Sequence, residues 1–194
     1  MNEIKKIKLK EEPQVIKNDS QTKEGGLRLP PTGSGSGGGT YIDYYTATTN
    51  LGSATVSITP FSWEGSGSGS ATFRVKKNQA GVHLTCELIR TSFDVHFTGN
   101  TYTIHNDEQN TDIEYISNNL NLAIQIDNPM GIVNYDVIQH TFENCTFSGT
   151  IITRNSNGEI TTTSISENKT IVVSFRLEVV GGQYTATNGT LAVL

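Results

Sequence analysis

The sequence predicts an all-β protein, and its composition, alternation and turn placement each support that prediction. The 194-residue chain holds 30 Ile and Val residues against 18 Ala and Leu, and it adds 26 Thr. β-branched side chains crowd a helix but pack well on a pleated sheet. Short apolar–polar alternations recur between turn signals at the spacing of a sandwich or barrel. We therefore expect an antiparallel β-sandwich or jelly-roll-like body with at most one short helix, preceded by an extended N-terminal arm.

Charge and composition divide the chain near residue 40. Residues 1–39 hold seven Lys and Arg against five Asp and Glu, whereas residues 40–194 hold seven against fourteen. Two prolines open the stretch 30–39, and the Gly/Ser run that follows them has almost no side chains to pack. We expect an extended arm over 1–29, a linker over 30–39 and one β-sandwich domain over 40–194.

The arm alternates apolar and charged residues in the manner of a strand. Such a segment has no core of its own, so two interpretations stand: an unstructured tail, or an arm that orders on a partner by strand addition or apolar pegs, with its lysines steering the encounter. We favour the partner-binding arm. Its expected anchors are the apolar side chains Ile4, Ile7, Leu9, Val15, Ile16, Leu27 and Leu29.

Within the body, alternation predicts many short strands joined by tight turns. Three dipeptides, Gly99-Asn100, Asn157-Gly158 and Gly181-Gly182, supply the positive φ that hairpin turns require. The expected strands are near 41–48, 53–60, 71–77, 82–90, 92–98, 100–105, 121–126, 132–140, 145–154, 159–166, 170–180 and 183–193.

Three local patterns refine this expectation. Phe93, Val95 and Phe97 should face the core while the residues between them face water. A capping-box pattern from Thr111 to Glu114 predicts one short helix near 112–120. The Gly/Ser repeat at 65–70 is expected to be a mobile loop between strands.

The start of the sequence and the setting of its two cysteines lead us to expect a reducing compartment. The sequence has no run of roughly 18 apolar residues, and its lysine-rich start is unlike a secretory signal. We therefore expect folding in a cytosol and no membrane partner. Cys86 and Cys145, both set among apolar residues, should be buried free thiols.

No motif in the sequence specifies a reaction. Asp94 and His96 share a strand face, and His83 on a neighbouring strand would give a geometry open to Zn²⁺ or acid–base work, although exposed polar residues on any half-buried sheet look the same. An acidic cluster could ligate Ca²⁺ but lacks regular ligand spacing, which favours a solvated loop. Its residues are Asp107, Glu108, Asp112 and Glu114.

These weak patterns lead us to expect a non-enzymatic protein without catalytic residues, metal or cofactor. An enzyme whose active-site residues meet only in the folded structure remains an open alternative. The acidic body repels phosphate at long range, which disfavours nucleic acid as a partner.

The layout of the whole chain, with Met1–Leu29 as arm, 30–39 as linker and 41–194 as body, resembles that of small virion structural proteins of tailed bacteriophages. Auxiliary and head-fibre proteins of crAss-like phages are the nearest type. The resemblance implies a capsid auxiliary, decoration or head-fibre protein on the capsid surface of the virion, folded in the host cytoplasm. It further implies an arm bound to the major capsid protein or other virion proteins, and a homo-oligomer, dimer or trimer.

A carbohydrate-binding or adhesin domain for host attachment is the alternative function. Aromatic side chains exposed on a sheet can stack on sugar rings. Tyr44 and Trp63 are the expected stacking residues.

Overall fold

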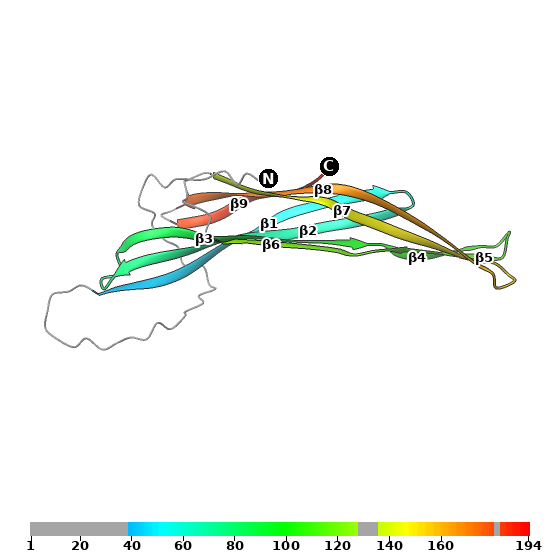
Figure 1. Ribbon diagram of the computed structural model, residues 1–194, viewed down its shortest axis with the longest axis horizontal. Coiled ribbons are helices and arrows are strands. Elements are labelled where there is room, and N and C mark those ends of the chain that lie inside the picture. The colour runs from blue at the N-terminus through cyan, green and yellow to red at the C-terminus, as the bar shows by residue number, and fades with distance from the viewer. Residues whose placement is uncertain (1–38, 128–135, 181–182) are drawn as a thin grey trace.

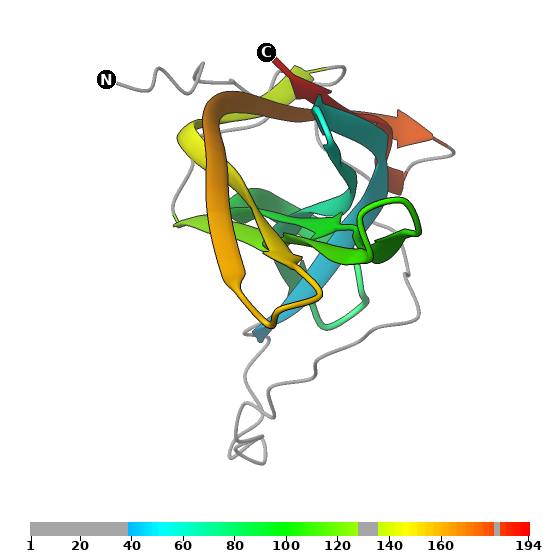
Figure 2. The ribbon, with the colours of Figure 1, turned by 90° about the vertical axis from the view of Figure 1, so that its right-hand side faces the viewer.

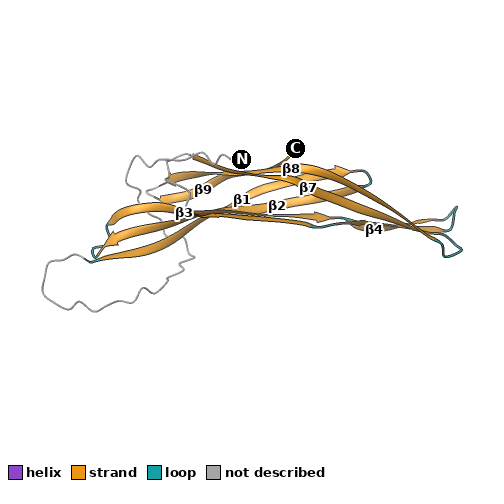
Figure 3. Ribbon diagram, in the orientation of Figure 1, coloured by secondary structure: helices purple, strands orange, loops and turns teal. Residues whose placement is uncertain are grey.

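The protein is an elongated β-sandwich (Figure 1). The computed structural model describes residues 39–127, 136–180 and 183–194, and every regular element there is a strand (Figure 3). Sheet A has the strand order β1-β2-β3-β6, and sheet B has the order β4-β5-β7-β8-β9. The predicted all-β class is confirmed. The strands are β1 (Thr40–Ile58), β2 (Phe61–Asn78), β3 (His83–Gly99), β4 (Thr101–Asn106), β5 (Thr111–Ser117), β6 (Leu120–Asp127), β7 (Asp136–Arg154), β8 (Ile160–Val180) and β9 (Gln183–Val193).

Both sheets are antiparallel, and most neighbouring strands are consecutive in the chain. In the view along the long axis, β8 rises on the left and arches over the top of the molecule toward β1, which rises on the right (Figure 2). The edge strands β1 and β9 lie against one another, since a Cβ added to Gly189 would sit 2.0 Å from the carbonyl oxygen of Asn50. One long side of the sandwich is therefore closed.

The strands are longer and fewer than predicted, because several expected turns are bulges within continuous strands. The predicted strands at 41–48 and 53–60 form the single strand β1, whose pairing with β2 shifts register between Asn50 and Ser53. Gly52 adopts a φ of 81° there, and its amide donates to Asn50 Oδ1 at 2.7 Å. The bulge absorbs the extra residues and leaves the strand uninterrupted.

The expected mobile loop at 65–70 is wrong, because this segment is the middle of β2. Its serines face outward, and its glycines continue the inward-facing positions that run from Trp63 to Phe73. The glycines leave room for aromatic rings: a Cβ on Gly65 would lie 2.2 Å from the ring of Phe97, and one on Gly69 would lie 2.5 Å from the ring of Phe175. The repeat is thus a close-packed strand.

The predicted helix near 112–120 is also wrong. Thr111–Ser117 is strand β5, which pairs with β4 on one side and with β7 on the other. β-branched Thr111, Ile113 and Ile116 favour the pleated conformation, and two neighbouring strands outweigh the local capping pattern.

The predicted hairpins have different outcomes. Asn157-Gly158 joins β7 to β8, and Gly158 has the expected positive φ of 80°. Gly181-Gly182 lies outside the described residues, although the flanking strands β8 and β9 do pair. The Gly99-Asn100 hairpin is wrong, because β3 belongs to sheet A and β4 to sheet B. Asn100 Oδ1 accepts from both Ser62 N and Ser117 Oγ, at 3.1 Å each. These hydrogen bonds link the two sheets at the point where the chain passes from sheet A to sheet B.

The core confirms the predicted alternation of β3. Phe93, Val95 and Phe97 are buried, and Asp94 and His96 face solvent. Both cysteines are buried free thiols, as predicted, and burial raises the pKa of Cys86 to about 12.

Candidate functional site

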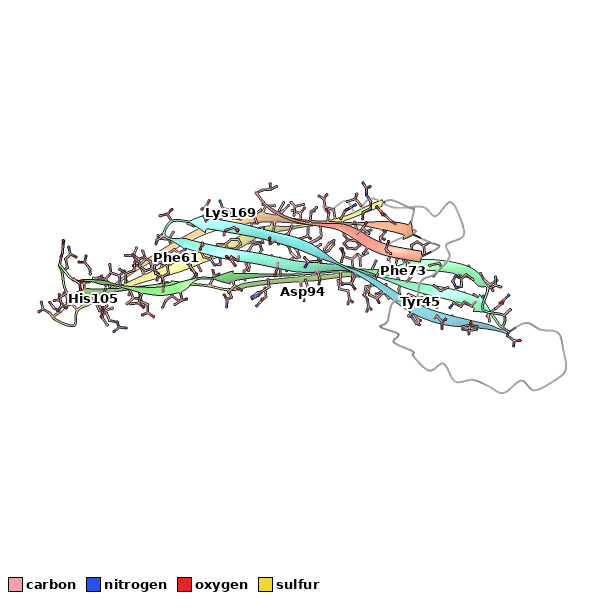
Figure 4. The ribbon with its side chains drawn as sticks, turned by 180° about the vertical axis from the view of Figure 1, so that it is seen from behind. Tyr45, Phe61, Phe73, Asp94, His105 and Lys169 are labelled. Atoms are coloured by element: carbon pink, nitrogen blue, oxygen red, sulfur yellow. The ribbon has the colours of Figure 1, made fainter. Side chains whose placement is uncertain are left out.

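The sandwich has two chemically different ends, which we call the base and the tip (Figure 1). The base holds the start of β1 and the turn between β2 and β3, because Thr40 pairs with Asn78. The tip holds β4, β5 and the adjoining ends of β7 and β8, because Asp112 pairs with both His105 and Arg154. Figure 4 places His105 at one extreme and Tyr45 toward the other. A binding site on the described body would lie at one of these two ends or on one of its two long faces.

The base exposes large apolar side chains close to the point where the described chain begins. Ile42 is 50% exposed and Val82 is 57% exposed, and Tyr41 and Leu84 are also on the surface. Beside them, Lys77 Nζ donates to Asp43 Oδ2 at 2.7 Å and also contacts the hydroxyl of Tyr45. Among the described residues, the base thus combines a Lys77–Asp43 ion pair with exposed apolar side chains.

At the tip, sheet B continues past the turn between β1 and β2 (Figure 1). The Tyr102 hydroxyl donates to the carbonyl oxygen of Pro60 in that turn at 3.2 Å, which marks the limit of sheet A. Tyr102 and Tyr115 stack with ring centroids 4.5 Å apart. Farther out, Ile104 is 47% exposed. The inner face of β4 and β5 therefore carries half-covered aromatic and apolar side chains.

The opposite face of β4 and β5, which we call the outer face, is acidic. His105 Nδ1 lies 2.6 Å from Asp112 Oδ1, and its Nε2 lies 3.4 Å from Asp107 Oδ1. Glu108 and Glu114 form no ion pair with any residue that the structure describes. The acidic cluster noticed in the sequence is thus gathered at the tip, with one histidine among its carboxylates.

The pKa of His105 should prove higher than the ordinary value of 6.5, because its hydrogen bond to Asp112 and the nearby carboxylates favour the imidazolium. A raised folded-state pKa means that the stabilising pair is fully formed below pH 6.5 and is lost as the pH rises through the folded-state value. NMR titration of the His105 ring should show the elevated pKa in the wild type. The Asp112→Asn variant should return it toward 6.5, and an unchanged midpoint would contradict the assignment.

The structure does not bring together His83, Asp94 and His96, the trio for which the sequence left a site open. His83 and His96 lie on the same strand, 13 residues apart, which at about 3.3 Å per residue is roughly 43 Å. His96 is held instead by Asn121 and by Thr98, whose Oγ1 is 2.8 Å from His96 Nε2. Over the described ranges, no group of three or more His, Cys, Asp or Glu residues could hold a metal ion.

The two predicted sugar-stacking residues lie far apart on different faces. Trp63 is 1% exposed, and its Nε1 donates to the carbonyl oxygen of Asn118 at 2.7 Å, so its ring has no face open to a sugar. Tyr44 pairs with Arg74 on the outward face of sheet A and is half-buried. The tyrosine pair at the tip was not predicted from the sequence. A helix was expected over 112–120, and only a strand there places Tyr115 directly opposite Tyr102.

The predicted anchors in the arm, from Ile4 to Leu29, lie outside the described residues, as does nearly all of the linker. No family model, curated protein or solved structure matches the chain. No helix in the described ranges is long and apolar enough to cross a membrane.

Proposed function

We propose that this chain is a non-enzymatic structural protein of a phage virion, a capsid auxiliary, decoration or head-fibre protein that is anchored through its N-terminal arm. The observation that carries the proposal is the polarity of the rod. The described chain begins at the base, beside exposed apolar side chains, while the acidic tip lies at the far end. An arm attached at one end of a rod suits a body that projects from a surface.

The base supports this proposal with a second contact area. Ile42, Val82 and Leu84 would be covered when the base rests on the major capsid protein or another virion protein. Burial of apolar surface contributes about 25 cal/mol per Å², so modest contacts at the base would add to those of the arm. Repetition over a symmetric shell then gives avidity without any single tight site.

Replacing Ile7 and Leu9 together with Asp should reduce the number of copies on particles at least ten-fold. Two charges at expected apolar anchors would have to be buried against the partner, which costs more than the anchors contribute. Particles of the encoding phage, supplied with wild-type or variant chain and purified on a gradient, would be compared by quantitative mass spectrometry.

The matched control adds the same two charges at polar positions of the arm, Gln14→Asp and Gln21→Asp, and it should leave occupancy unchanged. Circular dichroism should show an intact β body in both variants. Wild-type occupancy of the Ile7→Asp, Leu9→Asp variant would overturn the arm-anchored model.

A carbohydrate-binding or adhesin role is the second candidate, and the stacked Tyr102 and Tyr115 at the tip favour it. They lie in β4 and β5, far from the base, where a host-attachment surface of a projecting protein would lie. Sugar-specific binding of the full chain on a glycan array, unaffected by the arm substitutions, would support that role.

A further inference from the structure

Each sheet leaves one strand edge open. Within the described residues, β4 pairs with β5 alone and β6 pairs with β3 alone, whereas the remaining edge strands β1 and β9 lie against each other. An open edge presents unpaired backbone N–H and C=O groups, which an added strand can satisfy. The molecule therefore has two candidate acceptors for a strand, one at the tip and one along sheet A.

The β4 edge has a different chemistry on each of its faces. Directly opposed residues of an antiparallel pair share a face. The inner face carries the pair Tyr102 and Tyr115 and the exposed Ile104, so it offers apolar surface. The outer face carries Thr103 opposite Glu114 and His105 opposite Asp112, so it offers carboxylates, with Arg154 of β7 on the far side of Asp112.

The β6 edge also has an apolar inner face, but its outward face carries fewer carboxylates than the β4 edge. Its outward side chains Asn121, Ala123 and Gln125 are uncharged, and Asp127 is already paired with Arg90 at 2.8 Å. One strand farther in, Asp94 lies opposite Ala123 on this face, so a basic strand beside β6 would meet one carboxylate that forms no ion pair within the described residues. The carboxylates of Asp107, Glu108, Asp112 and Glu114 gather instead around β4. Two β4 edges would also repel one another through their carboxylates, which disfavours edge-to-edge pairing of identical tips.

Residues 4–10 of the chain match both faces of β4. This segment holds Lys5, Lys6, Lys8 and Lys10 and no acidic residue, and it alternates apolar Ile7 and Leu9 with Lys6, Lys8 and Lys10. As a strand, it would present Ile7 and Leu9, together with Lys5, to one side, and Lys6, Lys8 and Lys10, together with Ile4, to the other. Placed beside β4, the side with Ile7 and Leu9 would meet Tyr102 and Ile104, and the opposite side would meet Glu114 and the residues around His105.

We propose that residues 4–10 of one copy add as a strand to the β4 edge of a second copy. This inference rests on the partner-binding arm of the proposed function and names an acceptor for it. It specifies a head-to-tail contact, in which the base of one rod meets the tip of the next. Such a contact joins two different surfaces, so it generates chains or rings of copies rather than a closed two-fold dimer.

The donor is a second copy because of where the arm leaves the body. The arm joins the base, whereas β4 lies beyond the far end of β1, whose 19 residues span about 60 Å at roughly 3.3 Å each. To reach its own tip, an arm would have to run back along the whole rod. A neighbouring copy that stands base to tip needs no such detour.

The test uses two full-length variants that are each defective in one half of the contact. Ile7→Asp with Leu9→Asp removes the donor, and Thr103→Lys places a like charge on the acceptor strand. In analytical ultracentrifugation, the wild type should form oligomers that grow with concentration, and each variant alone should associate at least ten-fold more weakly. Mixed in equal amounts, the two variants should form one-to-one dimers, because one retains an intact arm and the other an intact β4 edge.

A matched charge on the other open edge, Gln125→Lys on β6, should leave association unchanged, and Lys8→Glu should restore association to the Thr103→Lys variant. Circular dichroism of every variant should match the wild type. A wild type that stays monomeric at all concentrations, or a mixture that forms no dimers, would overturn the proposal. Equal weakening by Gln125→Lys and Thr103→Lys would overturn the choice of β4.

These outcomes are separable from those of the virion proposal. Association through β4 in solution, together with absence from particles, would support the inference and contradict the virion role. Occupancy of particles by a chain that never associates with itself would do the reverse.

Discussion

Replacing Gly65 with valine should lower the free energy of unfolding by about 3 kcal/mol, because there is no room for a side chain at this position. A Cβ there would lie 2.2 Å from the ring of Phe97, which is fully buried and packs edge-on against Phe147 with ring centroids 5.2 Å apart. The ring therefore cannot move aside without disturbing the core. At about 2–4 °C per kcal/mol for a domain of this size, the Tm should fall by roughly 6–12 °C in calorimetry.

Two further variants separate this clash from a general effect of substitution in β2. Ser66→Val alters the next residue, which faces outward, and should change stability by no more than about 0.5 kcal/mol. Phe97→Leu, combined with Gly65→Val, should recover part of the loss, because the shorter side chain vacates the space. An unchanged Tm for Gly65→Val would mean that 65–70 behaves as the mobile loop that the sequence suggested.

The β2 glycines show which parts of this fold the sequence predicts and which it does not. Alternation of large apolar residues sufficed for β3, where Phe93, Val95 and Phe97 face the core as expected. In β2 the same alternation continues through glycines, which carry no hydrophobic signal of their own. Their inward role depends on rings contributed by β3 and β8, and so it becomes visible only in three dimensions.

The candidate site was less predictable than the fold for a related reason. The acidic cluster was visible in the sequence, but its meaning depends on which strands meet at the tip. A local capping pattern placed residues 112–120 in a helix, whereas pairing of β5 with β4 and β7 decides their conformation. That pairing brings Tyr102 against Tyr115 and sets His105 beside Asp112. Contacts between strands that are distant in the sequence therefore form the surface of the tip, and local sequence patterns did not predict it.

Replacing Trp63 with alanine should lower the free energy of unfolding by about 3–5 kcal/mol, which is a large share of the 5–15 kcal/mol typical of a domain. The indole packs between the two sheets, with its ring centroid 5.3 Å from that of Phe147 in β7. Its Nε1 donates to the carbonyl oxygen of Asn118, whose Oδ1 accepts from Ser148 N at 3.0 Å. Alanine would leave a cavity and an unsatisfied carbonyl at this junction.

Urea unfolding followed by far-UV circular dichroism is the suitable measurement, because Trp63 is the single tryptophan and its fluorescence disappears with it. Trp63→Phe should cost less than Trp63→Ala, since it refills part of the cavity without restoring the hydrogen bond. Tyr44→Ala, on the outward face of sheet A, should cost under about 1 kcal/mol. If Trp63→Ala instead kept full stability while sugar binding was lost, the indole would be a surface platform and the packing of the two sheets described here would be wrong.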